Sequence, residues 1–192
     1  MELYGKIVKL RALEMTDLEM LRKIVNDPEI EKLVGGWSFP ISKKEQEDWY
    51  NTIYRDKKNL RFAIETKEDG IIGMADLRNI DWKNRTASHG MKIGNRDYRK
   101  KGYGTDVVMS IMRYAFYELG LNRLECNILD YNIPSQKLYI DKCGWTVEGK
   151  KRQHIFKNNK FHDQLIVGIL KEEYEELIRK TNYWDDEQNG NW

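Results

Sequence analysis

The spacing of the apolar residues changes near Leu60, and this change restricts the folds open to the chain. Before it, apolar residues recur three and four positions apart, as in Leu18, Leu21, Ile24 and Val25, which is the spacing of one helical face. From Leu60 onward they alternate with other residues, as in strands with one buried face. A chain that begins with helices and continues with alternating strands is predicted to adopt an α+β fold.

About seven strands are expected, and their connections predict the sheet. The expected strands are residues 7–11, 60–64, 71–80, 87–93, 124–128, 145–156 and 160–170. Short turns join the second, third and fourth strands, which favours an antiparallel meander. A helical segment separates the fourth strand from the fifth, and such a crossover predicts parallel neighbours. The sheet should therefore be mixed and mostly antiparallel.

Capping patterns predict where the helices begin. Thr16 with Glu19, and Ser42 with Glu45, have the spacing of a capping box. Asn132 should cap a further helix, which carries a proline early in its first turn.

Length and composition indicate one small domain followed by a polar tail. The 192 residues include 33 Lys or Arg and 31 Asp or Glu, and the net charge of +2 is too small to favour a nucleic-acid partner. No apolar run approaches the ~20 residues of a membrane span, and no secretory signal is recognisable. We expect a domain at 1–180, a tail at 181–192 flanked by Trp184 and Trp192, and a cytoplasmic location. The two cysteines cannot form a four-ligand metal site.

One glycine-containing loop has the composition of an anion site. Residues 99–104 read Arg-Lys-Lys-Gly-Tyr-Gly and stand between an expected strand and an expected helix. The glycines let the backbone turn tightly, and the amides at a helix N-terminus favour an anion. The loop lacks the Gly-Lys-Ser/Thr ending of a P-loop, and it does not follow the first strand of a parallel sheet as a dinucleotide fingerprint does. Nucleotide hydrolysis and hydride transfer are therefore disfavoured.

A second set of motifs follows this loop along the chain. Asn132 and Ser135 come first, then Tyr139, and then Lys-Cys-Gly-Trp at 142–145. Together with the Arg-x-x-Gly-x-Gly pattern of 99–104, these residues resemble the GNAT superfamily of acyl-CoA-dependent N-acetyltransferases. The branch of ribosomal-protein and polyamine acetyltransferases is the most similar. The resemblance implies a GNAT fold, with helices on both faces of the sheet and a central pair of strands that splay apart.

The resemblance also implies where acetyl-CoA binds. The cofactor would lie between the splayed strands, with no metal ion involved. The backbone of Met91, Lys92 and Ile93 would face the pantetheine and the thioester, and Asn132 and Ser135 belong to the same cofactor-binding set. The residues implied to hold the pyrophosphate are Arg99, Lys100, Lys101, Gly102, Tyr103, Gly104 and Thr105.

Tyr139 is the implied proton donor to the departing thiolate. The amine acceptor would attack the thioester directly, and an amide donor would stabilise the developing oxyanion. One residue more than the usual family spacing separates Tyr139 from Gly144. Either a π-bulge in the helix absorbs this residue, or Tyr139 is displaced from the reaction centre.

Several groups compete for the role of base. His89 has the same strand parity as Met91 and an ordinary pKa suited to the task. Asp76 and Glu125, on the flanking strands, and deprotonation through water are alternatives. Cys126 alternates with apolar residues, which favours packing in the core over a nucleophilic role.

The acceptor site is expected in the N-terminal helical region. Its candidates are Trp37, Phe39 and Trp49 with Glu31, Glu45, Glu47 and Asp48. Such a lining suits a cationic amine, but the same residues equally describe a solvated helix face. The acceptor would be a small amine, similar to a polyamine or an aminoglycoside, or the N-terminus of a protein.

Two other functions remain open from the sequence. A non-catalytic acyl-CoA-binding module would bind the cofactor without turnover. A nucleic-acid or ribosome-associated protein would show affinity that falls steeply with salt. The resemblance also allows a homodimer.

Overall fold

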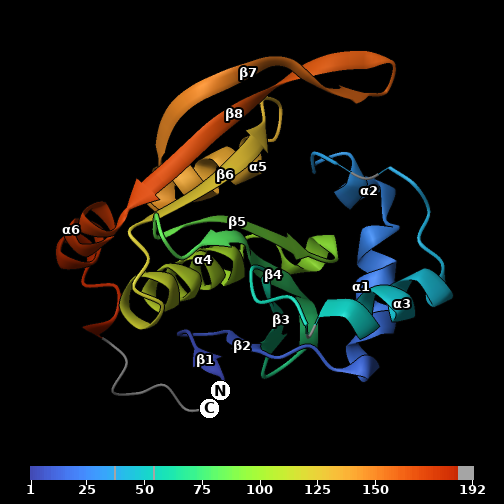
Figure 1. The fold of residues 1–192 in the computed structure, drawn as a ribbon, viewed down its shortest axis with the longest axis horizontal. Helices are drawn as coiled ribbons and strands as arrows, with labels where there is room; N and C mark the ends of the chain where they lie inside the picture. Colours follow the sequence, from blue (N-terminus) through green and yellow to red (C-terminus); the bar gives the residue numbers. More distant parts are fainter. Residues whose placement is uncertain (37, 54, 186–192) are drawn as a thin grey trace.

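The computed structural model describes residues 1–36, 38–53 and 55–185 of the chain (Figure 1). Its strands form a single mixed sheet in the order β1-β2-β3-β4-β5-β6-β8-β7. The strands are β1 (Leu3–Tyr4), β2 (Lys9–Arg11), β3 (Leu60–Thr66), β4 (Gly70–Asp81), β5 (Thr86–Ile93), β6 (Arg123–Leu129), β7 (Thr146–Lys157) and β8 (Lys160–Leu170). The predicted α+β class, the antiparallel meander of β3 to β5 and the parallel pairing of β5 with β6 are confirmed.

Helices pack on both faces of this sheet. They are η1 (Met15–Asp17), α1 (Leu18–Val25), α2 (Pro28–Glu31), α3 (Lys43–Ile53), η2 (Arg96–Tyr98), α4 (Tyr103–Arg113), α5 (Ile133–Gln136), α6 (Lys171–Thr181), and the π-helical turns η3 (Tyr114–Glu118) and η4 (Lys137–Lys142). One core cluster joins α4 and the face of β4 that carries Ala75 and Leu77. A smaller cluster joins α1 and α3 to the opposite face at Ala63.

The N-terminal strand is shorter than predicted, and a small strand precedes it. The prediction of a strand over 7–11 is wrong in extent, because only Lys9–Arg11 pair with β3. The carboxylate of Asp106, on α4, accepts hydrogen bonds from the backbone N–H groups of Lys6 (2.9 Å), Ile7 (2.7 Å) and Val8 (2.9 Å). Residues 6–8 therefore curl around a buried side chain instead of extending the ladder.

One of the two predicted capping boxes forms and the other does not. Ser42 and Glu45 exchange hydrogen bonds at the start of α3, with the Ser42 N–H donating to Glu45 at 2.8 Å. The prediction for Thr16 and Glu19 is wrong. The carboxylate of Asp17 instead accepts from the Glu14 N–H at 2.8 Å, so the cap lies two residues earlier in the chain. This cap begins η1, which leads into α1.

The splay between the two parallel strands is confirmed. The register pairs Thr86, Ala87 and Ser88 of β5 with residues 123–125 of β6, and no pair follows. β6 pairs with β8 along its whole length, while β5 continues beside β4 to Ile93. Figure 1 shows the two strands diverging. The edge of β5 beyond Ser88 is thus left without a neighbouring strand.

A π-bulge absorbs the extra residue before Gly144. Asn132 caps the helix, since its side chain accepts a hydrogen bond from the Ser135 N–H at 3.2 Å. Further on, the Cys143 N–H donates to the Leu138 carbonyl at 3.0 Å, which is the five-residue step of a π-helix. The bulge predicted as one of two alternatives is therefore present.

The C-terminal segment folds back onto α4. The Tyr183 hydroxyl donates to Asp106 at 3.0 Å, and the Trp184 indole N–H donates to the Tyr174 hydroxyl at 2.8 Å. Trp192, the other tryptophan of the expected tail, lies outside the described residues. No helix in the described part of the chain is long and apolar enough to cross a membrane.

Candidate active site

The glycine loop shapes the end of the splay. Lys100 and Gly102 have positive φ values of 63° and 88°, and Gly102 occupies the N-cap position of α4. The N–H groups of the first turn of α4 have no carbonyl partner within the helix, as at any helix N-terminus. A Cβ atom at Gly104 would lie 3.3 Å from the side chains of both Leu138 and Met91. The loop therefore combines a left-handed turn, free amides and close packing of α4 between β5 and η4.

The three cations of this loop are exposed. Arg99, Lys100 and Lys101 all lie at the surface. The nearest ion pair is a long one, between the Lys101 ammonium and Asp69 at 3.9 Å. These side chains can thus reach an anion in front of α4 without first breaking a strong contact.

Asn132 already has two partners within the chain. Besides capping its helix, its side-chain amide donates to the Leu33 carbonyl at 2.7 Å. The Tyr131 hydroxyl donates to the neighbouring Lys32 carbonyl at 2.7 Å. Both residues therefore fasten the segment after α2 beside β6. Ser135 lies one turn into the helix and is partly buried.

Tyr139 lies in a buried aromatic cluster at the base of the splay. Its side chain is 5% exposed, and its ring packs edge-on against Trp145 at 5.0 Å between centroids. Within the described residues its hydroxyl has no hydrogen-bond partner. Burial raises the pKa of Tyr139 well above its ordinary value. The side chain is consequently a neutral phenol, able to donate its proton but not to remain ionised.

His89 shares the predicted strand face but is sealed from the surface. It is fully buried, and its ring lies 5.8 Å from that of Tyr139. Its Nδ1 is 2.8 Å from the Asp76 carbonyl, whereas Nε2 has no partner in the described part of the chain. Burial lowers the pKa of His89 to about 4. The imidazole is therefore neutral near pH 7 and out of reach of an acceptor.

Asp76 faces the other side of the sheet. Its carboxylate pairs with the Arg78 guanidinium at 2.9 Å and retains 14% side-chain exposure. Burial raises the pKa of Asp76, although Arg78, Arg61 and Lys92 oppose this shift. Glu125, the other candidate carboxylate, contacts Arg123 at 3.3 Å and is 43% exposed. Of the two, Asp76 is the more desolvated.

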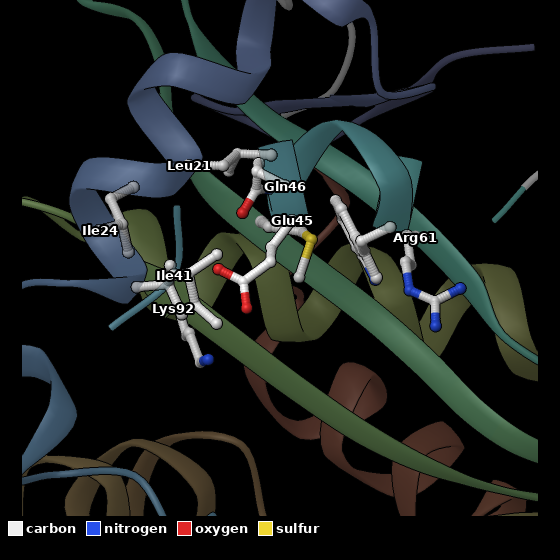
Figure 2. Close-up of a pocket in the computed structure, with 10 residues that line it drawn as sticks. Leu21, Ile24, Ile41, Glu45, Gln46, Arg61 and Lys92 are labelled. Atoms are coloured by element: carbon white, nitrogen blue, oxygen red, sulfur yellow. The ribbon is translucent and has the colours of Figure 1, made fainter. Parts of the chain in front are cut away.

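A cavity of about 280 Å³ lies on the Asp76 face, under α1 and α3 (Figure 2). Its lining consists of Leu21, Ile24, Val25, Ile41, Glu45, Gln46, Trp49, Arg61, Met74 and Lys92. Figure 2 shows Glu45 and Gln46 reaching in from α3, opposite Lys92 of β5. The lining thus joins an apolar wall to a few charged groups, as small-molecule sites do.

Of the predicted acceptor residues that the structure describes, two line this cavity, namely Glu45 and Trp49. Glu31 instead forms an ion pair with the ammonium of Lys157, a residue of β7 that is 5% exposed. Phe39 is 68% exposed. Trp37 lies outside the described residues.

The two remaining acidic candidates contact lysines on α3 itself. Glu47 lies 3.9 Å from Lys43, and Asp48 pairs with Lys44. These contacts fit the alternative interpretation, in which the acidic residues form a solvated helix face and not an acceptor site.

The side chains of Arg61, Gln46 and Lys92 line the cavity but were not predicted to do so. Strand alternation could have indicated Lys92, since Met91 and Ile93 point to the opposite face. Arg61 stands directly across from Asp76 in the register of β3 and β4, which no local motif reveals.

A mixed sheet that opens between two parallel strands, with a glycine loop capping the next helix, defines an acyl-CoA-dependent acyltransferase. The chain belongs to the acetyltransferase (GNAT) domain family, whose model matches residues 8–146. It is an N-acetyltransferase with acetyl-CoA as co-substrate. No group of three or more potential metal ligands occurs among residues 1–36, 38–53 and 55–185.

Known relatives agree with this assignment. An uncharacterized N-acetyltransferase derived from the SPbeta prophage of Bacillus subtilis is 27% identical over 171 residues, covering 89% of this chain and 94% of that protein. Spermidine N(1)-acetyltransferase of Vibrio cholerae is 28% identical over 167 residues, covering 86% and 94%. The crystal structure of the Vibrio cholerae spermidine N-acetyltransferase in complex with CoA and spermine matches with a TM-score of 0.80 at 26% identity. This match covers 88% of the present chain and 98% of that chain.

Proposed function

We propose that the enzyme acetylates a small-molecule primary amine that binds in the cavity under α1 and α3. The observation that carries the proposal is the cavity, because it reaches Lys92 on β5, the strand that loses its neighbour at the splay. Its volume of about 280 Å³ suits a small molecule better than a folded protein surface. The spermidine acetyltransferase among the relatives supports a small amine as the class of acceptor.

Acetyl-CoA approaches from the opposite side of the splay. The unpaired edge of β5 at 90–93 offers backbone groups to the amide-bearing pantetheine arm, since such groups require partners. The first turn of α4 and the loop at 99–105 receive the pyrophosphate through amides and cations. Asn132 and Ser135 stand beside this path at the start of α5. The acetyl group then lies between the two half-sites.

The transfer needs two proton movements. A bond forms between the amine nitrogen and the acetyl carbon, and the bond from that carbon to sulfur breaks. The amine gives up a proton, and the departing thiolate takes one. Tyr139 supplies the second proton, because its neutral hydroxyl has no competing hydrogen bond in the described chain and sits at the base of the splay.

Asp76 is our candidate for receiving the proton of the amine, directly or through water. It shares a sheet face with the cavity residues Arg61 and Lys92. The raised pKa of Asp76 makes it a stronger base than an ordinary aspartate. His89 packs against Tyr139 and orients that ring, and we assign it no proton transfer because it is fully buried.

Thiol release from acetyl-CoA with a panel of amines tests the proposal. The panel contains polyamines, aminoglycosides, amino acids and peptides with free N-termini, and calorimetry measures acetyl-CoA binding alongside. We expect thiol release with a small amine. Release only with peptides would contradict the class of acceptor. Tight acetyl-CoA binding without release for any amine would favour the non-catalytic module instead.

A further inference from the structure

Two cations of the cavity lack a close carboxylate partner. The Lys92 ammonium has no carboxylate within 4.0 Å in the described chain, and Figure 2 shows it at the lower edge of the cavity. The Arg61 guanidinium donates to the Asn59 carbonyl at 3.3 Å, lies 3.8 Å from the Asp56 carboxylate, and is 5.7 Å from the centre of the Trp49 ring. Partly buried cations of this kind favour an anion that arrives with the ligand.

The single carboxylate in the cavity lining does not balance them. Glu45 stands on α3 at the exposed rim, where it accepts the Ser42 N–H at 2.8 Å as part of the helix cap. Asp76, nearby on the same sheet face, is already paired with Arg78. A polyamine would add further positive charges to a site that holds an excess of them, and like charges repel strongly at low dielectric.

The charges form a pattern that suits a zwitterion. In the register of the sheet, Asp76 lies between Arg61 on β3 and Gly90 on β5, and Met74 lies beside Lys92. On this face Asp76 thus has Arg61 directly across from it and Lys92 diagonally across from it, in addition to Arg78, with which it is paired. The remaining wall is apolar and comes from Leu21, Ile24, Val25, Ile41, Trp49 and Met74.

We infer that the acceptor carries a carboxylate close to its amine, as an apolar amino acid does. Lys92 and Arg61 bind the carboxylate, the apolar wall receives the side chain, and the amine points to Asp76 on β4, beside Gly90 of β5. This inference rests on the proposed function and gives Lys92 and Arg61 the role of specificity-determining residues. It separates this enzyme from relatives that acetylate spermidine, although the fold is shared.

Matched acceptors test the inference. Leucine is compared with 3-methylbutan-1-amine, which lacks the carboxylate, with leucinamide, in which it is neutral, and with the dipeptide Leu-Gly, in which it is displaced. Spermidine is included. We expect kcat/KM for leucine to exceed the values for the uncharged analogues and spermidine by about 10- to 100-fold, the size of a charge-assisted contact. A preference for Leu-Gly over leucine would contradict a carboxylate close to the amine and would indicate a peptide as the acceptor.

Two variants locate the contact. Lys92→Gln and Arg61→Gln should raise KM for leucine about tenfold and should change KM for 3-methylbutan-1-amine by much less. Lys43→Gln is the control, because the side chain of that lysine is 80% exposed and does not line the cavity. Thermal unfolding and acetyl-CoA binding confirm that each variant is folded.

The outcomes separate the inference from the function on which it rests. Three results would overturn the inference that the acceptor carries a carboxylate, while leaving acetyl transfer intact. They are equal rates for leucine and 3-methylbutan-1-amine, a preference for spermidine, and equal losses for all acceptors in Lys92→Gln. Absence of transfer to every amine would contradict the proposed function, and the inference with it.

Discussion

The two halves of the proposed active site are built in different ways. The side proposed to bind the cofactor consists mainly of backbone groups: the free edge of β5, the left-handed turn at Gly102 and the first turn of α4. The acceptor side consists of side chains from α1, α3, β3, β4 and β5, which are far apart in the sequence. A backbone site tolerates many sequences that preserve its geometry. A side-chain site changes its ligand with single substitutions, so relatives can share a cofactor and differ in acceptor.

The largest loss of kcat is expected at Tyr139, where the cofactor side and the acceptor side meet. Tyr139→Phe removes the proposed proton donor and should lower kcat by about 10²- to 10⁴-fold, the usual contribution of a general acid. Calorimetry should find acetyl-CoA affinity unchanged, because the ring and its packing on Trp145 remain. Tyr117→Phe, at a residue of η3 that is 45% exposed, serves as the control. An unchanged kcat in Tyr139→Phe would remove Tyr139 from the mechanism.

His89 should affect stability with pH rather than catalysis. Its pKa is about 4 in the folded chain against an ordinary value of 6.5, so the unfolded chain takes up a proton first as pH falls. The stabilisation by the neutral imidazole is therefore present above pH 6.5 and lost progressively toward pH 4. The loss is at most about 3 kcal/mol for a shift of this size.

Denaturant unfolding at pH 7 and pH 4.5 measures this loss. The wild type should lose more unfolding free energy between these pH values than His89→Asn does. The kcat of His89→Asn at pH 7 should stay within a few-fold of wild type where the variant is folded. A large decrease of kcat in a folded His89→Asn protein would support His89 as the general base.

On the cofactor side, Gly102→Ala should weaken acetyl-CoA binding about tenfold. The φ of 88° at this position strains any side chain by about 1–2 kcal/mol, and relaxation of that strain tilts the amides of α4. Gly120→Ala is the matched control, since Gly120 has a φ of 65° and open space around it, far from the loop. Equal losses of acetyl-CoA affinity in both variants would show that stability alone is responsible.

The features that could be predicted from the sequence are those that depend on residues close together in the chain. The loop at 99–104, the cap at Asn132 and the π-bulge before Gly144 are local, and each could be predicted. The Thr16 cap failed because Asp17, bound also to Arg11, competes for the same helix start. The charged lining of the cavity could not be predicted, because Arg61 on β3 and Lys92 on β5 are brought to the same cavity only by the pairing of both strands with β4.

Filling the cavity most directly tests the claim that the acceptor and the cofactor bind in separate halves of the site. Ile41→Trp places a large ring in the cavity lining, away from the loop at 99–104. The measurement is KM for the best acceptor beside the calorimetric Kd for acetyl-CoA. We predict that KM rises at least about tenfold while Kd stays within about twofold, since steric filling acts on the acceptor alone. A weakened Kd with an unchanged KM would show that this cavity belongs to the cofactor and that the acceptor binds elsewhere.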